Sequence, residues 1–196
     1  MSSKSIRLFR NDSLESLTHV HPIVPLLFWS PVVVFLLWRS LFVHDLPAIQ
    51  VALVAIPGLV VWSLLEYLLH RFVFHFDAAT AAGRWLVYLF HGVHHDAPND
   101  KSRLVMPPAG AVIIMAVLWS VFVSVLPAPW AEPFCASFIV GYLIYDYLHF
   151  ATHHFRMRHR WLQSLKRHHM QHHFSATDAK YGVSSPLWDW VFGTLH

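Results

Sequence analysis

Residues 47–75 read PAIQVALVAIPGLVVWSLLEYLLHRFVFH, an apolar stretch from Pro47 to Leu69 that runs into two histidines, His70 and His75. The apolar part is close to the ~20 residues that a membrane-spanning helix needs. Its middle carries no charged residue, so it lacks the polar face of a helix on the surface of a soluble protein. We therefore predict a transmembrane helix that carries histidines at its end.

Three further apolar stretches complete the pattern, namely His21–Val43, Pro107–Leu126 and Pro133–Leu148. The short connections around Asp45 and at residues 127–132 would join the four stretches into two antiparallel hairpins. Prolines 47, 107 and 133 are expected at helix starts, where a missing N–H costs little. The last stretch is the shortest and would need added residues or less tilt to span a bilayer. The sequence predicts an all-α fold of four transmembrane helices in two hairpins.

The composition agrees with a membrane environment. Of the 196 residues 56% are hydrophobic and 13% are charged, whereas an average soluble domain has about 25% charged residues. This disfavours a soluble four-helix bundle. The length fits one domain, and the net charge of +3 is too small to indicate nucleic acid as a partner. The single cysteine, Cys135, excludes an internal disulfide and a thiolate metal cage.

The basic residues predict the orientation of the helices. Thirteen of the 14 Lys and Arg residues fall on one side of the four stretches, and only Arg39 falls on the other. By the positive-inside rule the populated side is cytosolic, with both termini there. Residues 1–20 would form a cytosolic N-terminal segment and residues 21–196 the membrane domain. Trp85–Val93 and Met157–Phe174 have helical spacing and would form a histidine-rich helical cap on that side.

Most of the 17 histidines are grouped at or beyond a predicted membrane boundary on the cytosolic side. The groups are His70 and His75; His91, His94 and His95; His149, His153 and His154; and His168, His169, His172 and His173. In each HxxHH motif the three histidines stand at i, i+3 and i+4, positions that share a helix face. His70 and His75 are about 140° apart on an ideal helix. They would serve one site if the helix unwinds near Arg71, or would reach two metals.

Ten imidazoles are too many for one ion, so the clusters favour two bound metal ions. Imidazole suits iron, zinc, copper and nickel, and ligand type alone does not choose among them. The lack of thiolates and the few nearby carboxylates argue against structural zinc or calcium. A pH sensor would not require the repeated spacing. His19, His21, His44, His159 and His196 stand apart from the clusters and are expected to be structural or solvated.

Five motifs resemble the fatty acid hydroxylase superfamily, the sterol desaturase-like integral membrane di-metal oxygenases. They are EYLLHRFVFH (66–75), HGVHHDAPND (91–100), RLVMPP (103–108), GYLIYDYLHFATHH (141–154) and YGVSSPLWDWVFGT (181–194). RLVMPP and YGVSSPLWDWVFGT are most similar to the fatty acid 2-hydroxylase branch. The resemblance implies that residues 21–196 form an integral membrane hydroxylase domain.

The resemblance also implies which side chains bind metal. The implied ligands are His70, His75, His91, His94, His95, His149, His153, His169, His172 and His173. His154 would lie near the site without binding metal, and His168 only flanks its motif. Glu66 and Asp146 precede ligands by about one turn and are candidates for orienting imidazole N–H groups.

In such enzymes two iron ions and O2 hydroxylate the 2-position of a long fatty acyl chain, free or lipid-bound. Zinc could replace iron in purified protein. Arg71, Arg103 and Tyr181 are candidates to contact the substrate's polar end. Some members carry a fused haem domain, and the short segment before the first stretch suggests none here. We therefore expect a separate ferredoxin, cytochrome or reductase, and favour a bacterial inner membrane over an endoplasmic reticulum.

Two other readings compete with fatty acyl hydroxylation. One is another oxygenase of the superfamily, acting on a sterol, carotenoid or alkyl ether, against which the segment 181–194 argues. The other is a non-catalytic membrane metal or haem protein for transport or electron transfer. Transporters place polar groups near the bilayer midplane, whereas the middles of these apolar stretches are uncharged.

Overall fold

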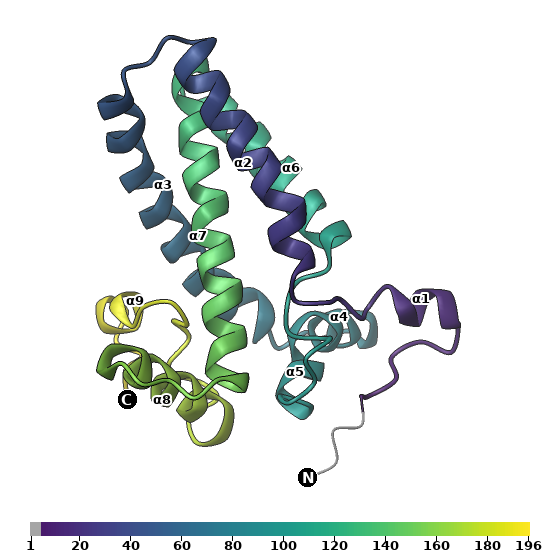
Figure 1. Ribbon diagram of the computed structural model, residues 1–196. Helices are drawn as coiled ribbons and strands as arrows, with labels where there is room; N and C mark the ends of the chain where they lie inside the picture. The colour runs from purple at the N-terminus through teal and green to yellow at the C-terminus, as the bar shows by residue number, and fades with distance from the viewer. Residues whose placement is uncertain (1–4) are drawn as a thin grey trace. The chain divides into compact units, whose positions relative to one another are not determined.

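The computed structural model describes residues 5–196, and their regular secondary structure is entirely helical (Figure 1). The α-helices are α1 (Asp12–Ser16), α2 (Val24–Phe42), α3 (Ala48–Leu69), α4 (Ala81–Val87), α5 (Val93–Asp96), α6 (Pro108–Val125), α7 (Ala128–His154), α8 (Arg160–Phe174) and α9 (Leu187–Val191). Two π-helical turns, η1 (His70–Phe74) and η2 (Tyr88–Gly92), continue α3 and α4. Lys4, one of the basic residues used to predict orientation, lies outside the described residues.

Four helices are long and apolar enough to cross a membrane: α2, α3 with η1, α6 and α7. The first three match the predicted stretches closely. The prediction for the fourth is wrong at its start, because α7 begins at Ala128 and has 27 residues. Pro133 therefore lies inside the helix and not at its first residue. Pro133 is the sixth residue of α7, so it removes one intrahelical hydrogen bond, the one to the carbonyl of Pro129.

The chain forms two compact units. We call residues 23–63 and 106–144 the apolar unit, and residues 5–22, 64–105 and 145–196 the histidine unit. The apolar unit contains α2, α6 and parts of α3 and α7. The histidine unit contains the predicted metal ligands and the shorter helices.

Helix α7 is the central helix of the apolar unit. Its apolar window is 67% buried, against 11% for that of α6. Close approach of α3 and α7 depends on two glycines. A Cβ on Gly58 would lie 2.7 Å from the carbonyl oxygen of Phe134, and one on Gly141 would lie 2.7 Å from the Trp62 ring. The Trp62 ring also packs edge-on against Phe138 at 5.2 Å.

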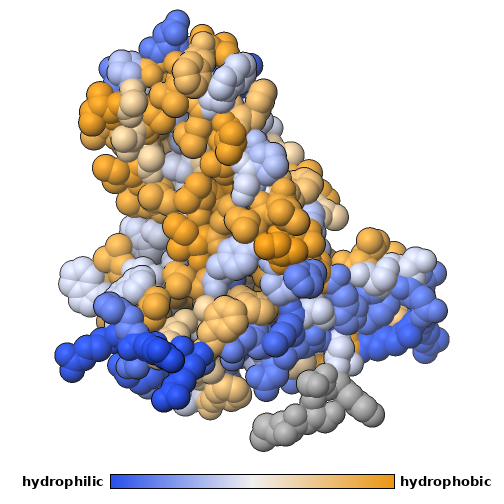
Figure 2. All heavy atoms as spheres, in the orientation of Figure 1, coloured by the Kyte–Doolittle hydropathy of each residue, from blue (hydrophilic) through white to orange (hydrophobic). Residues whose placement is uncertain are grey.

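The outward side chains of these helices are apolar. Leu27 on α2, Ile113 on α6 and Val125 on α6 are 66%, 68% and 73% exposed. Figure 2 shows this hydrophobic surface in orange over the long helices, with hydrophilic surface over α1 and α8. Large exposed apolar surfaces are unusual in soluble monomers and suit contact with lipid tails. The chain is a multi-pass membrane protein.

The histidine unit is held together partly by its N-terminal segment. Asn11 caps α1 by accepting hydrogen bonds from the backbone N–H groups of Ser13 and Leu14. The N–H of Val20 donates to the carbonyl of Ser102 at 2.7 Å. Helix α8 buries His169, His172 and His173 and exposes Arg160 and Arg167. The structure thus confirms the predicted helices near 85–93 and 157–174, with shifted ends.

Candidate metal centre

The π-turn η1 explains how His70 and His75 reach the same site. The backbone N–H of His75 donates to the carbonyl of His70 at 3.2 Å, which is the i→i+5 bond of a π-helix. Each π-turn takes up more residues than an α-turn, so side chains five apart return to one face. Of the two arrangements left open by the sequence, the structure has the one in which both histidines serve one site.

The HGVHH motif, in contrast, divides between two sites. His91 and His95, which are four residues apart, belong to one group of histidines, and His94 belongs to the other. The motif HHMQHH on α8 also divides between the two groups, but its i, i+4 pair belongs to the other group. His169 and His173 join the group of His94, and the single His172 joins the group of His91. The two histidines at i and i+4 therefore belong to the same group, as a shared helix face predicts, whereas the histidine at i+3 belongs to the other group.

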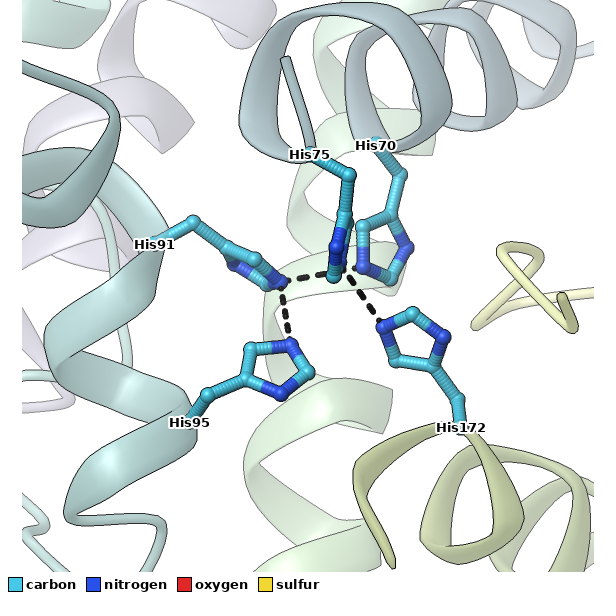
Figure 3. A group of neighbouring side chains, drawn as sticks. All are labelled: His70, His75, His91, His95 and His172. Carbon is cyan, nitrogen blue, oxygen red and sulfur yellow. Dashed lines mark hydrogen bonds between the residues drawn. The ribbon is translucent and has the colours of Figure 1, made fainter. Parts of the chain in front are cut away.

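The ten implied ligands form two groups of five, and within each group one ring nitrogen per residue lies within 4.8 Å of the others. The His70 group is His70, His75, His91, His95 and His172; the His94 group is His94, His149, His153, His169 and His173. Figure 3 shows the imidazoles of the His70 group pointing toward a common centre from three parts of the chain. The two groups adjoin, because the rings of His95 and His173 stack at 4.2 Å.

The distances between ring nitrogens fit a bound ion. In the His70 group, Nε2 of His91 lies 3.0 Å from Nε2 of His70 and 2.9 Å from Nε2 of His95. In the His94 group, Nε2 of His94 lies 3.0 Å from Nε2 of both His149 and His173. Neighbouring ligand atoms at about 2.1 Å from a metal ion are themselves about 3 Å apart. Five converging Nε2 atoms cannot all be satisfied by hydrogen bonds to one another, since a neutral imidazole has one N–H.

Two backbone carbonyls fix the tautomer of ligands in the His70 group. Nδ1 of His70 donates to the carbonyl of Tyr181 at 2.5 Å, and Nδ1 of His172 donates to that of Ala179 at 2.7 Å. The proton is thereby held on Nδ1, and the Nε2 lone pair is directed to the centre. This arrangement is characteristic of metal-binding histidines.

Burial keeps these imidazoles neutral. Desolvation, assisted by neighbouring histidines, lowers the pKa of His75 to about 4, of His95 to about 2 and of His173 to about 3. The pKa values of His91, His94 and His169 are lowered well below 6.5 for the same reasons. Neutral imidazole is the form that binds metal. The residues present therefore fit two transition-metal ions with nitrogen ligands.

Four residues predicted to lie near the ligands are placed outside the two groups. Glu66 accepts hydrogen bonds from the N–H groups of Val183 and Ser184 at 2.7 and 2.8 Å, so its observed contacts are with the backbone and not directly with an imidazole. Asp146 is 1% exposed and lies one turn before His149. The ring of His154 packs 4.6 Å from that of Phe150. His168 contacts Asp189, with its Nε2 3.0 Å from Oδ2.

The three candidates for substrate contact have different surroundings. Arg71 is partly exposed, donates to the Tyr67 hydroxyl at 2.8 Å and lies 5.0 Å above the Phe72 ring. The ring of Tyr181 packs 5.6 Å from those of His70 and His75. Arg103 has a 3% exposed side chain that is bound by Glu15 and by Thr18. These contacts of Arg103 are structural, and its contact with substrate stays a prediction.

Sequence reasoning missed Asp189 and the carbonyl of Ala179. Asp189 is fully buried and accepts hydrogen bonds from Tyr181, Gly182, Thr194 and His168. The available signal was its position in WDW, an acid among aromatic residues, because a buried acid requires partners. A backbone carbonyl carries no signal in residue type, so the role of Ala179 could not be read from the sequence.

Two adjoining groups of five imidazoles place the chain in a class, that of membrane proteins able to hold two metal ions through nitrogen ligands. The family model for fatty acid hydroxylases matches residues 53–194. The chain belongs to the fatty acid hydroxylase family, and it is an enzyme. Both predictions made from the resemblance are thus confirmed.

Individual relatives agree with this assignment. A dihydroceramide fatty acyl 2-hydroxylase of Arabidopsis thaliana is 37% identical over 96% of this chain and 79% of its own length. The human fatty acid 2-hydroxylase is 36% identical over 98% of this chain and 57% of its own length. The solved structure of full-length Scs7p, in which only the hydroxylase domain is visible, matches with a TM-score of 0.87 and 38% identity. The match covers 92% of this chain and 69% of Scs7p.

Proposed function

We propose that this chain is a di-iron enzyme that hydroxylates the 2-position of a long fatty acyl chain, as a free acid or within a lipid. The observation that carries the proposal is the pair of adjoining groups of five converging imidazoles. The names of the relatives, fatty acid and dihydroceramide fatty acyl 2-hydroxylases, support the substrate and the position. When bound, ferrous ions at these groups would supply the reductive activation of O2 that attack on an unactivated C–H bond requires.

The protein's own residues would hold the metal ions, orient the substrate and exclude water from the site. The His70 and His94 groups would each hold one ion with neutral nitrogen ligands. Burial of His70, His94 and His169, which are 2%, 4% and 0% exposed, would keep bulk water away from a reactive centre. Arg71, the residue after a ligand, would meet the polar end of the substrate, since its guanidinium has donors beyond the one used by Tyr67. The Tyr181 ring would line the site that receives this polar end of the substrate.

The reaction consumes O2, two electrons and two protons, and yields the hydroxylated acyl chain and water. The electrons would come from a donor such as a ferredoxin, a cytochrome or a reductase. The basic residues of the histidine unit would place that unit and both termini on the cytosolic side. A lipid substrate would then reach the enzyme from the bilayer, with its polar end at the cytosolic interface.

The test is the fatty acid profile of cells that express the chain together with an electron donor. Wild type is compared with His172→Ala from the His70 group and His94→Ala from the His94 group. His159→Ala, which changes an exposed histidine outside both groups, is the matched control. We expect 2-hydroxy acyl chains with wild type and His159→Ala only. Metal-loaded wild type that yields no hydroxylated acyl chain, or that yields only ring or ether oxidation, would refute the proposal.

A further inference from the structure

Residues 179–184 form an irregular segment that contacts the His70 group through two backbone carbonyls. The carbonyl of Ala179 accepts from His172 and that of Tyr181 accepts from His70. We call this stretch the carbonyl segment. The segment contains no regular secondary structure, so no helix or strand keeps its carbonyls in position. Other contacts must therefore hold the segment in place if Nδ1 of His70 and Nδ1 of His172 are to stay protonated.

Two buried carboxylates do so by binding four consecutive backbone N–H groups. Asp189 accepts from Tyr181 through Oδ1 and from Gly182 through Oδ2, each at 2.8 Å. Glu66 accepts from Val183 and Ser184, both through Oε1. Asp189 is 0% exposed and Glu66 is 4% exposed, and a buried carboxylate with several hydrogen bonds holds its partners firmly. The carbonyl segment is thus anchored along its N–H groups.

Of the two carboxylates, Asp189 makes further contacts beyond the carbonyl segment. Its Oδ1 also accepts from the Thr194 hydroxyl at 2.8 Å, and its Oδ2 also lies 3.0 Å from Nε2 of His168. His168 is the neighbour of the ligand His169 on α8. The approach is tight, because a Cβ on Gly182 would lie 2.8 Å from Oδ2 of Asp189 and 2.1 Å from the carbonyl oxygen of Ser185. Asp189 therefore joins α8 to the carbonyl segment.

We propose that Asp189 is a positioning residue that selectively supports metal binding by the His70 group. It acts through the carbonyl segment on the Nδ1 protons of His70 and His172, and it touches no metal ligand of that group itself. In the His94 group, the Nδ1 atoms of His149, His169 and His173 are buried and have no hydrogen-bond partner among residues 5–196. Loss of Asp189 should therefore weaken one of the two metal positions and spare the other. The inference rests on the proposed function only in requiring that both groups bind metal.

The experiment measures iron retained per chain in purified, detergent-solubilised protein. Ferrous iron is loaded without oxygen and then challenged with increasing chelator, and zinc is used in parallel. Asp189→Asn places an amide N–H against the donors that now meet a carboxylate oxygen. We expect one of the two ions to be lost at roughly 10–100-fold lower chelator concentration, the range found when partners of metal-ligating histidines are changed. Glu132→Gln, at a buried carboxylate of the apolar unit that binds Arg39, is the matched control and should retain both ions.

Two backgrounds show which ion is affected. His94→Ala leaves the His70 group intact, and His172→Ala leaves the His94 group intact. We expect Asp189→Asn to weaken retention in the His94→Ala background and to change nothing in the His172→Ala background. Equal weakening in both backgrounds would mean general destabilisation, and no weakening in either would mean no role for Asp189. Either result overturns the proposal.

A milder variant covers the case in which Asp189→Asn does not fold. Thr194→Val removes one of the four hydrogen bonds to Asp189 and should give a smaller loss in the same background. An unchanged retention curve for folded Thr194→Val would then count against the proposal. If His94→Ala and His172→Ala both hold as much metal as wild type, the metal assignment of the proposed function fails instead. The metal readout requires no hydroxylation, so the two failures are distinguishable.

Discussion

Glu15 and Arg103 form a buried ion pair that fastens the N-terminal segment to the rest of the histidine unit. Their side chains are 13% and 3% exposed. The Arg103 guanidinium also donates to Thr18 at 2.7 Å and lies 2.9 Å from Nε2 of His19. RLVMPP, which in the sequence is a specific mark of the 2-hydroxylase branch, thus begins with a residue whose observed contacts are structural.

The charge of Glu15 gives a pH dependence of stability. Burial by itself raises the pKa of Glu15, but hydrogen bonds from the N–H groups of Phe9 and Leu8, contact with His19 and the charge of Arg103 lower it from 4.5 to about 2. Because the folded-state pKa is depressed, this stabilisation is complete above about pH 4.5 and is lost as pH falls toward 2. We expect Glu15→Gln to lower the melting temperature in detergent at pH 7 and to differ less from wild type as pH falls below 4.5. A difference that stays constant from pH 7 to pH 3 would contradict this.

Arg71 allows a sharper test of substrate contact. Its guanidinium is placed by the Tyr67 hydroxyl and by the Phe72 ring, one residue from the ligand His70. Loss of a charge-assisted hydrogen bond costs about 1.5–3 kcal/mol. We expect Arg71→Ala to raise KM roughly tenfold or more with little change in kcat, the pattern of lost uniform binding. Iron content should stay at the wild-type level, and Arg160→Ala on the exposed face of α8 should leave KM unchanged. A fall in kcat with an unchanged KM would assign Arg71 to the metal centre instead.

The helices show how much of the fold the hydrophobic pattern of the sequence predicts. Apolar length predicted all four spanning helices, because the cost of exposing polar backbone in lipid leaves few alternatives, and only the start of α7 was predicted wrongly. Pro133 was expected at the start of the helix, but α7 begins five residues earlier and accommodates the proline inside it at the loss of one hydrogen bond. The grouping of ten histidines agrees with the resemblance, but the division of each HxxHH motif depends on the direction from which each helix approaches. The π-turn at His70 could not be predicted either, because a five-residue spacing between two histidines does not distinguish a π-turn from two separate sites.

Contact between α3 and α7 within the apolar unit gives a prediction about packing. At Gly58 a Cβ would meet the Ser137 hydroxyl oxygen at 2.0 Å and the Phe134 carbonyl oxygen at 2.7 Å. A side-chain rotation can relieve the first contact, but only a backbone shift can relieve the second. Alanine gains about 1 kcal/mol in helix propensity over glycine, and overpacking costs about 1–3 kcal/mol. We therefore expect Gly58→Ala to be destabilising.

The measurement is the thermal unfolding midpoint of the detergent-solubilised protein. Ala52→Val, at an exposed position of the same helix, serves as the control and should have little effect. An increase in the midpoint for Gly58→Ala would mean that propensity outweighs packing and that the two helices can separate at low cost.

The chain as a whole combines helices suited to lipid with a histidine unit that carries most of its basic residues. Twelve of the basic residues used to predict orientation lie in the described part of that unit, and Arg39 lies in the apolar unit, 2.9 Å from Glu132. At that end of α2 the charge of Arg39 is thus paired with a carboxylate. This distribution of Lys and Arg is the basis of the prediction that the histidine unit faces the cytosol.

The orientation can be measured with single cysteines, because Cys135 is the only native one and Cys135→Ser gives a cysteine-free background. Ser13 precedes the first spanning helix and Ser164 lies on α8, whereas Ala128 is the first residue of α7, just after the turn that follows α6; all three are exposed. We expect a membrane-impermeant maleimide, applied to intact cells, to label Ala128→Cys and to label Ser13→Cys and Ser164→Cys only after permeabilisation. Labelling of all three in intact cells would reverse or break the proposed topology. Labelling of Ser13→Cys and Ser164→Cys without Ala128→Cys would place both groups of histidines outside the cytosol. A cytosolic electron donor could not then reach them, and the proposed source of electrons would be wrong even if hydroxylation were confirmed.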